Sequence, residues 1–200
     1  IVSKMTEKKI SPEVIVYMQE VKELTTIQAI NNMISIGGAV TYKSVVKHEL
    51  ITQYPGLITA VECVGSPPIR VVATPAGNLA TAAPAPDCAV MLLALDAKVR
   101  IVSIAGERDV PLKNFFINTG ETVLKSNEVI KEILIPLSGG SSYSGYARLA
   151  RKKGQDIAKI LVGVAYDLTE GKLTNVKIAL GALSNTPIRA NSLEQMVEGK

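Results

Sequence analysis

The sequence predicts an α+β fold, in which helices pack on largely antiparallel sheets. Helix-like and strand-like stretches follow one another in mixed order, without the strict strand–helix alternation of a doubly wound fold. After residue 145, three strand-like stretches are joined by short connections. The chain has 200 residues, of which 47% are hydrophobic, so it can bury a sizeable core.

The first third of the chain predicts strands and then helices. Residues 11–24 favour a short strand followed by a polar helical turn, and residues 25–45 favour two strands. The second of these ends at Gly37-Gly38, where the chain must turn or let another group approach closely. A helix is expected over about 43–53, a shorter one over 56–65, and a strand over 69–74.

Residues 75–86 lack a regular hydrophobic period and predict a loop of small residues. Asp87 is then suited to be the N-cap of a buried helix over 88–97. Next we expect a strand over 98–106, a turn over 107–110, a short turn or helix over 111–117, and a strand that ends at Pro136.

A Gly/Ser-rich joint over residues 138–145 predicts the domain boundary. It separates a first domain, 1–137, from a second, 146–200. The second domain predicts strands over 146–152, 157–168 and 175–183, a hairpin connection over 169–175, and a helix within 187–200.

Composition argues against several classes of function. The net charge is only +4, and there are six Tyr, two Phe and no Trp, so the aromatic platforms of single-strand nucleic-acid binding are scarce. The longest apolar run, residues 88–95, is too short to span a membrane. Because no leader pattern is visible and there are two cysteines without a CxxC motif, we expect a cytoplasmic protein without a disulfide framework or a four-cysteine metal site.

The stretch from Thr74 to Asp87 is the strongest candidate for a ligand site. Its small side chains leave backbone N–H groups accessible, and such groups bind phosphate oxygens. Gly77 permits close approach, Asn78 offers a donor and an acceptor, and Asp87 could accept hydrogen bonds from ribose hydroxyls. The alternative is a tight loop in which Asp87 serves only as a helix cap. No GxGxxG or P-loop motif accompanies the stretch.

The segment "IRVVATPAGNLATAAPAPDCAVMLLALDAKVRIVS" resembles the flavin-binding subunit, or domain, of the molybdenum hydroxylase family, which includes xanthine dehydrogenase and aerobic carbon monoxide dehydrogenase. The resemblance extends to "SIGGAVTYKSV", to "GERDVPLKNFF" and to "YARLARKKGQDIAKILVGVAYDL". The positions that match the family's hallmark in register are Thr74, Gly77, Asn78, Leu79, Ala80, Ala82, Pro84 and Asp87.

The resemblance implies a PCMH-type FAD-binding subdomain followed by the start of a C-terminal α+β domain of the CO dehydrogenase flavoprotein type. It also implies roles for individual residues. Arg148 or Lys152 would lie near the flavin edge. The residues implied to contact the cofactor are Gly38, Ala39, Thr74, Ala76, Gly77, Asn78, Thr81 and Asp87.

The implied function is electron transfer by non-covalently bound FAD. A molybdopterin-binding large subunit would oxidise the substrate, and an iron–sulfur small subunit would relay electrons to the flavin, which passes them to NAD or another acceptor. The molybdenum cofactor and the iron–sulfur clusters would therefore belong to partner subunits of a hetero-oligomer, with neither nucleic acid nor a membrane span involved.

Two departures from the family pattern keep alternatives open. Pro75 and Ala76 replace the usual Ile/Leu-Gly, and an earlier A-G-G-T-D-L-type loop, the family's second phosphate cradle, is absent from the given residues. One alternative is accordingly a flavin-free docking subunit. The other is a self-sufficient flavin oxidase, whose flavin would be tethered through His48 or Cys63.

Overall fold

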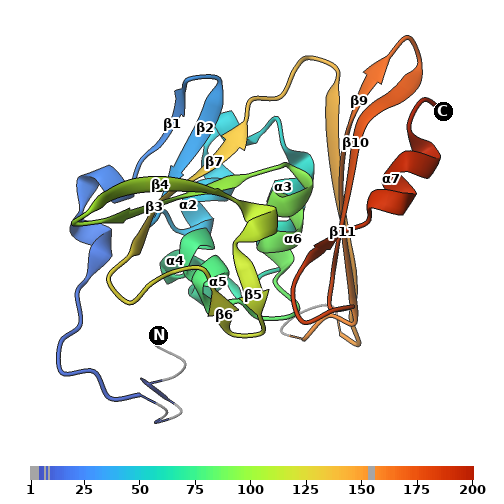
Figure 1. Ribbon diagram of the computed structural model, residues 1–200. Helices are drawn as coiled ribbons and strands as arrows, with labels where there is room; N and C mark the ends of the chain where they lie inside the picture. The colour runs from blue at the N-terminus through green and yellow to red at the C-terminus, as the bar shows by residue number, and fades with distance from the viewer. Residues whose placement is uncertain (1–4, 7, 9, 153–155) are drawn as a thin grey trace.

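The computed structural model describes residues 5, 6, 8, 10–152 and 156–200, and it contains three antiparallel sheets with helices between and beside them (Figure 1). The five-stranded sheet has the order β1 (Ile27–Ile30), β2 (Met33–Gly37), β7 (Val129–Pro136), β3 (Lys98–Ser103) and β4 (Gly106–Pro111). The four-stranded sheet has the order β11 (Ile188–Arg189), β10 (Lys172–Gly181), β9 (Ile160–Thr169) and β8 (Ser142–Leu149). β5 (Phe116–Asn118) pairs with β6 (Glu121–Thr122), after the short 3-10 helix η4 (Leu112–Asn114). This architecture confirms the predicted α+β class.

The two strands predicted in residues 25–45 are β1 and β2, joined by a hairpin turn at Asn31-Asn32, where both residues have positive φ. The predicted turn over 107–110 is wrong, because these residues lie in β4. Cross-strand pairing explains how this charged segment forms a strand: Asp109 lies opposite Arg100, and their side chains form an ion pair of 2.7 Å. Its position at the edge of the sheet tolerates the charges.

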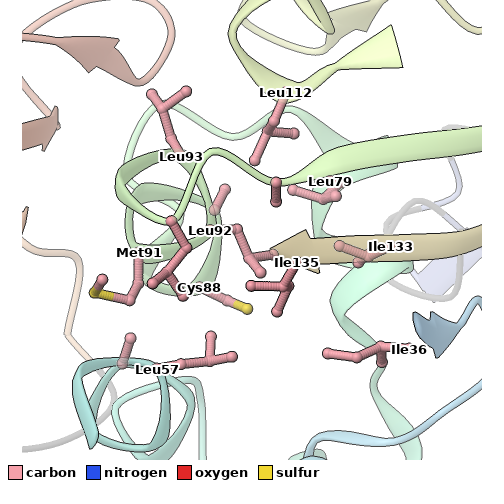
Figure 2. Packing of buried hydrophobic residues seen from close by; sticks show 14 of the residues in the cluster. Ile36, Leu57, Leu79, Cys88, Met91, Leu92, Leu93, Leu112, Ile133 and Ile135 are labelled. Atoms are coloured by element: carbon pink, nitrogen blue, oxygen red, sulfur yellow. The ribbon is translucent and has the colours of Figure 1, made fainter. Parts of the chain in front are cut away.

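Helix α6 (Asp87–Ala94) lies at the centre of the molecule, where it contacts β9 and β10 of the four-stranded sheet as well as α3 (Pro55–Glu62). The side chains from Cys88 to Ala94 are all buried, which confirms the predicted buried helix. Figure 2 shows Cys88, Met91 and Leu92 pointing toward residues of other elements, including Leu57 and Ile135. The same core contains Ile133 of β7 and Leu161 of β9, so the two sheets share one core.

Two strands predicted in the first half are wrong. Residues 69–74 lie mostly in helix α4 (Pro67–Val72), because Pro67 and Pro68 set the φ of a first helical turn and cannot donate hydrogen bonds to a sheet ladder. Residues 11–17 form no strand, since no neighbouring strand pairs with them. The polar turn after them is confirmed as the 3-10 helices η1 (Met18–Glu20) and η2 (Lys22–Leu24).

The helix predicted over 43–53 is shorter than expected. It is divided into α2 (Tyr42–Lys47) and the 3-10 helix η3 (Glu49–Ile51) at His48, whose backbone is extended. The Nδ1 atom of His48 accepts a hydrogen bond from the N–H of Leu50 at 3.3 Å, so the only histidine of the chain caps a helix.

The predicted strands of the second half are confirmed as β8, β9 and β10, and the last two meet in a hairpin at Glu170-Gly171. Helix α7 (Asn191–Val197) confirms the helix expected near the end of the chain and packs on β10. β8 begins at Ser142, inside the stretch predicted as a joint. Within the described ranges, no helix combines the length and the apolar character that crossing a bilayer requires.

Candidate functional site

Helix α5 (Pro75–Thr81) replaces the loop predicted from residue 75 onward. The hydroxyl of Thr74, the N-cap, accepts a hydrogen bond from the N–H of Gly77 at 2.9 Å, and Pro75 occupies the first helical position, where its lack of an N–H has no cost. The helix ends at Ala82, which has a φ of 47°. A Thr-Pro pair before small residues signals the start of a helix. The prediction of a loop is wrong because it relied on hydrophobic periodicity, which does not detect this signal.

The first turn of α5 has two features suited to a ligand. Gly77 is exposed, and a Cβ added there would lie within 4 Å of only one atom outside its own helix backbone, the Thr74 hydroxyl oxygen at 3.1 Å. The side-chain oxygen Oδ1 of Asn78 is buried, and it has no hydrogen-bond partner among the described residues. A buried acceptor without a partner is unfavourable unless a donor reaches it.

Two other candidate residues of α5 are occupied by the chain itself. The Ala76 side chain is buried in the core, and the Thr81 hydroxyl donates to the carbonyl oxygen of Gly77 at 2.8 Å. The Pro75-Ala76 departure from the family pattern is therefore compatible with this helix, since both residues face the interior.

The start of α2, which follows the turn after β2, is joined to the segment before α5, because the N–H of Tyr42 donates to the carbonyl oxygen of Ala73 at 2.9 Å. In that turn, Gly38 donates to Lys131 O at 2.7 Å and Ala39 donates to Leu24 O at 2.8 Å. A Cβ at Gly38 would overlap the carbonyl oxygen of Ile130. The close approach predicted here is thus to the protein's own strand β7, whereas the predicted contact of Gly38 and Ala39 with a cofactor stays a prediction.

Asp87 is the first residue of α6 and makes no capping hydrogen bond with its side chain, so the prediction of an N-cap is wrong. Its Oδ1 accepts a hydrogen bond from the hydroxyl of Tyr146 at 2.7 Å and forms an ion pair with Nη1 of Arg148 at 3.1 Å. Burial raises the pKa of Asp87, while Tyr146 and Arg148 act in the opposite direction.

Arg148 and Lys152, predicted near a flavin edge, differ in their surroundings. The Arg148 guanidinium is turned inward and also donates to the carbonyl oxygens of Cys63 at 3.1 Å and Asp156 at 2.5 Å. Lys152 is exposed, and its backbone N–H donates to Asp156 Oδ2 at 3.0 Å. Sequence reasoning missed Tyr146, although its position two residues before Arg148 on a strand puts both on one face.

A cavity of about 500 Å³ adjoins this region, between α2 and α4. Tyr42, Val46 and Val71 contribute its apolar part. Its charged residues are Lys43, Lys47, Arg70 and Glu62, so its rim carries more positive than negative charge. Within the part of the chain that the structure describes, no group of three or more His, Cys, Asp or Glu could hold a metal ion.

Residues 1–138 match the family model of the FAD binding domain in molybdopterin dehydrogenase, and residues 145–200 match that of the CO dehydrogenase flavoprotein C-terminal domain. The chain is 31% identical over 193 residues to the nicotinate dehydrogenase FAD-subunit of Eubacterium barkeri, and 28% identical over 192 residues to the glyceraldehyde dehydrogenase medium chain of Sulfolobus acidocaldarius. These alignments cover 94% and 96% of this chain but 65% and 68% of those proteins, so the chain spans about two thirds of their length.

Among solved structures, a chain of the carbon monoxide dehydrogenase from Hydrogenophaga pseudoflava matches all of this chain and 69% of its own length, with a TM-score of 0.93 and 26% identity. The fold, the two family matches and the relatives agree with one another. They confirm the resemblance seen in the sequence: the chain belongs to the molybdopterin dehydrogenase FAD-binding family, in its combination with the CO dehydrogenase flavoprotein C-terminal domain.

Proposed function

We propose that this chain is the FAD-binding part of an electron-transfer subunit in a molybdenum-containing hydroxylase or dehydrogenase. The observation that carries the proposal is the buried, unpartnered Oδ1 of Asn78, in the first turn of α5 beside the open face of Gly77. Both features are accounted for if a group with hydrogen-bond donors lies against this turn. Membership of a family of FAD-binding domains supports FAD as that group.

The residues present fit such a cofactor. Asn78 would accept a hydrogen bond through Oδ1, Gly77 would let the cofactor approach the backbone, and Asp87 would accept from a sugar hydroxyl. Thr74, Ala76 and Thr81 would shape the turn through the contacts described above. Gly38 and Ala39 would border the site from the turn between β2 and α2; the hydrogen bond from Tyr42 in α2 to Ala73 joins that helix to the residue before Thr74.

When bound, FAD would supply the redox chemistry, collecting electrons and passing them on in pairs. We propose that the electrons come from the iron–sulfur clusters of a small subunit, that a molybdopterin-binding large subunit oxidises the substrate, and that NAD or another acceptor receives the electrons. The relatives support this assembly, since they are named as a FAD-subunit and as a medium chain. The role of the protein is to bind and orient the flavin.

A self-sufficient oxidase with covalently attached flavin is less well supported by the two residues proposed as tethers. His48 uses Nδ1 to cap η3. Burial raises the pKa of the Cys63 thiol, which lowers its fraction of reactive thiolate. Both observations disfavour Nδ1 of His48 and the Cys63 thiol as attachment points for a flavin.

An absorbance spectrum of the purified full-length protein, before and after addition of FAD and removal of the excess, tests the proposal. We expect flavin absorption bands, with the flavin released into the supernatant by acid precipitation. Flavin that stays with the acid precipitate would instead indicate covalent attachment. A protein without flavin, even in the presence of its partner subunits, would overturn the proposal and leave a docking subunit.

A further inference from the structure

Two side chains of β8 converge on a single oxygen atom of Asp87. Tyr146 donates its hydroxyl to Oδ1, and Nη1 of Arg148 pairs with that same Oδ1. For Oδ2, the described residues provide no hydrogen bond from another side chain or from another residue's backbone. The Asp87 carboxyl also accepts a hydrogen bond from its own backbone N–H. Because a carboxylate has about four lone-pair sites, it keeps the capacity to accept a further hydrogen bond through Oδ2.

The alternation of the strand explains why both side chains reach Asp87. Tyr146 and Arg148 are two residues apart and so project from the same face of β8, as does Ser144, which accepts a hydrogen bond from the N–H of Gly56 in α3. This face is turned toward α3, which packs on β8. Tyr143 has the opposite parity, is 48% exposed, and stacks on Tyr166.

Arg148 is itself fixed by further contacts. Besides Asp87, its guanidinium donates to the carbonyl oxygens of Cys63 and Asp156, so that it bridges the end of α3, the start of α6 and the segment after β8. The side chains of Arg148 and Asp87 are 15% and 14% exposed. Because the pair is mostly buried and Arg148 makes additional hydrogen bonds, its geometry is fixed more firmly than that of a surface salt bridge.

Tyr146 and Arg148 lie in the segment that matches the C-terminal domain family, whereas Asp87 lies in the FAD-binding domain. We propose that Tyr146 and Arg148 are positioning residues, through which the C-terminal domain holds Asp87 with Oδ2 directed at a hydroxyl of the flavin dinucleotide. This inference rests on the proposed function. It adds that flavin affinity depends on residues outside the segment that matches the FAD-binding domain.

The ionised form of Asp87 is stabilised mainly by Tyr146 and Arg148, because the other described groups around it carry no positive charge. The other titratable groups that face it are Cys63 at the end of α3, Cys88 in α6 and Tyr42 in α2, and none of them carries a positive charge. Burial of Cys88 raises its pKa to about 12, so this thiol stays neutral. Arg148 is therefore the one cation among the described groups that face the Asp87 carboxylate, and Tyr146 is the neutral donor that supports it.

The test is a fluorescence titration of the full-length protein with FAD, after its own flavin has been removed. Tyr146→Phe keeps the ring and deletes the hydroxyl, and Arg148→Met keeps the apolar stem and deletes the charge. Tyr143→Phe and Arg151→Met are matched controls, because Tyr143 faces away from Asp87 and Arg151 is exposed. We expect each of the two test variants to weaken FAD binding about tenfold, since a hydrogen bond to a charged group is lost, and each control to change the dissociation constant by less than about twofold.

The proposal also predicts a coupling. In an Asp87→Asn background, Tyr146→Phe should change FAD affinity by less than about twofold, since the group that Tyr146 positions has lost its charge. Arg148→Lys should recover part of the affinity that Arg148→Met loses. Equal effects of Tyr146→Phe in both backgrounds, or unchanged affinity in both Tyr146→Phe and Arg148→Met, would overturn the positioning role.

The pH profile of FAD affinity separates positioning from a general structural role. Tyr146 and Arg148 lower the pKa of Asp87 against the effect of burial, so removing either one raises this pKa. Affinity should then begin to fall at a higher pH on acidification in Tyr146→Phe and Arg148→Met than in the wild type. A profile that keeps the wild-type pH dependence while the affinity drops would contradict the inference.

The failure of this inference can be told apart from the failure of the proposed function. If the full-length protein binds FAD but Asp87→Ala binds it equally well, the role of Asp87 toward the cofactor is wrong. If Asp87→Ala weakens FAD binding while neither Tyr146→Phe nor Arg148→Met does, the role of Asp87 toward the cofactor stands and the proposed contribution of the C-terminal domain is wrong.

Discussion

Gly38 and Gly77 are both proposed to border the flavin site, but only at Gly38 does neighbouring backbone exclude a side chain. At Gly38, a Cβ would overlap the carbonyl oxygen of Ile130 in β7. At Gly77, a Cβ would lie 3.1 Å from the Thr74 hydroxyl oxygen, with no backbone of another element within 4 Å among the described residues. The first glycine is required by the packing of the chain on itself. At the second, the described residues bring only the Thr74 hydroxyl close to a Cβ, and the small side chain agrees with the flavin contact proposed above.

This difference shows that a glycine-rich motif does not by itself locate a cofactor. Both glycines fall in segments that resemble the flavin-binding family, and both allow close approach of another group. Only the atoms around each Cβ position show whether the approaching group is the protein's own backbone. Substitutions at the two positions should therefore separate stability from flavin affinity.

The largest effect is expected for Gly38→Ala, on stability. The carbonyl of Ile130 belongs to the backbone of the central strand β7, where Ile130 pairs with Ile101 of β3, so it cannot move without disturbing the ladder between β3 and β7. We expect the free energy of unfolding to fall by about 3 kcal/mol, as for other overpacked core positions. Urea denaturation of the full-length protein without flavin measures this loss.

Gly140→Ala is the matched control, since a Cβ at Gly140 has nothing within 4 Å and the residue is exposed. It should change the free energy of unfolding by less than about 0.5 kcal/mol. Equal stability of Gly38→Ala and Gly140→Ala would show that the contact with β7 does not require a glycine at position 38.

A smaller effect is expected for Thr74→Ala, which removes the hydroxyl that lies closest to Gly77. The N–H of Gly77 then loses its acceptor at the start of α5. Loss of such an N-cap costs about 1 kcal/mol of stability. Thr74→Ser keeps the oxygen and should stay within a few tenths of a kcal/mol of the wild type. A Thr74→Ala protein as stable as Thr74→Ser would argue against the cap, and thermal unfolding of both variants decides the matter.

Strongly patterned elements of the fold could be predicted from the sequence. The alternating or apolar runs of β3, β7, β9 and β10 and the continuous apolar run of α6 are local signals, and all were found. α4 and α5 were missed, because their start signals are prolines and a capping threonine rather than a hydrophobic period. β4 was missed because its charged residues depend on Arg100, a partner on another strand.

The candidate site could be located by its resemblance to a family, but its internal geometry could not. Thr74, Gly77 and Asn78 are close in sequence, so a local motif contains them. The hydrogen bond between Tyr146 and Asp87 joins residues 59 positions apart. No local pattern encodes such a pairing, which arises only when β8 packs beside the start of α6. The same holds for the close approach of Gly38 to Ile130.

The smallest effect on stability is expected for Gly77→Ala, which tests the other half of the comparison. Alanine in place of a helical glycine favours the helix by up to about 1 kcal/mol, while the tight contact of its Cβ with the Thr74 hydroxyl opposes this gain. We therefore expect the free energy of unfolding to change by less than about 0.5 kcal/mol.

The added methyl group projects from the exposed side of α5, where the flavin dinucleotide would lie. FAD affinity should therefore fall about tenfold, the effect of a methyl-sized obstruction of close contact. A fluorescence titration with FAD and a urea titration on the same preparation give both quantities. Unchanged FAD affinity would remove Gly77 from the site, whereas a large loss of stability would mean that Gly77, like Gly38, is required by the fold itself.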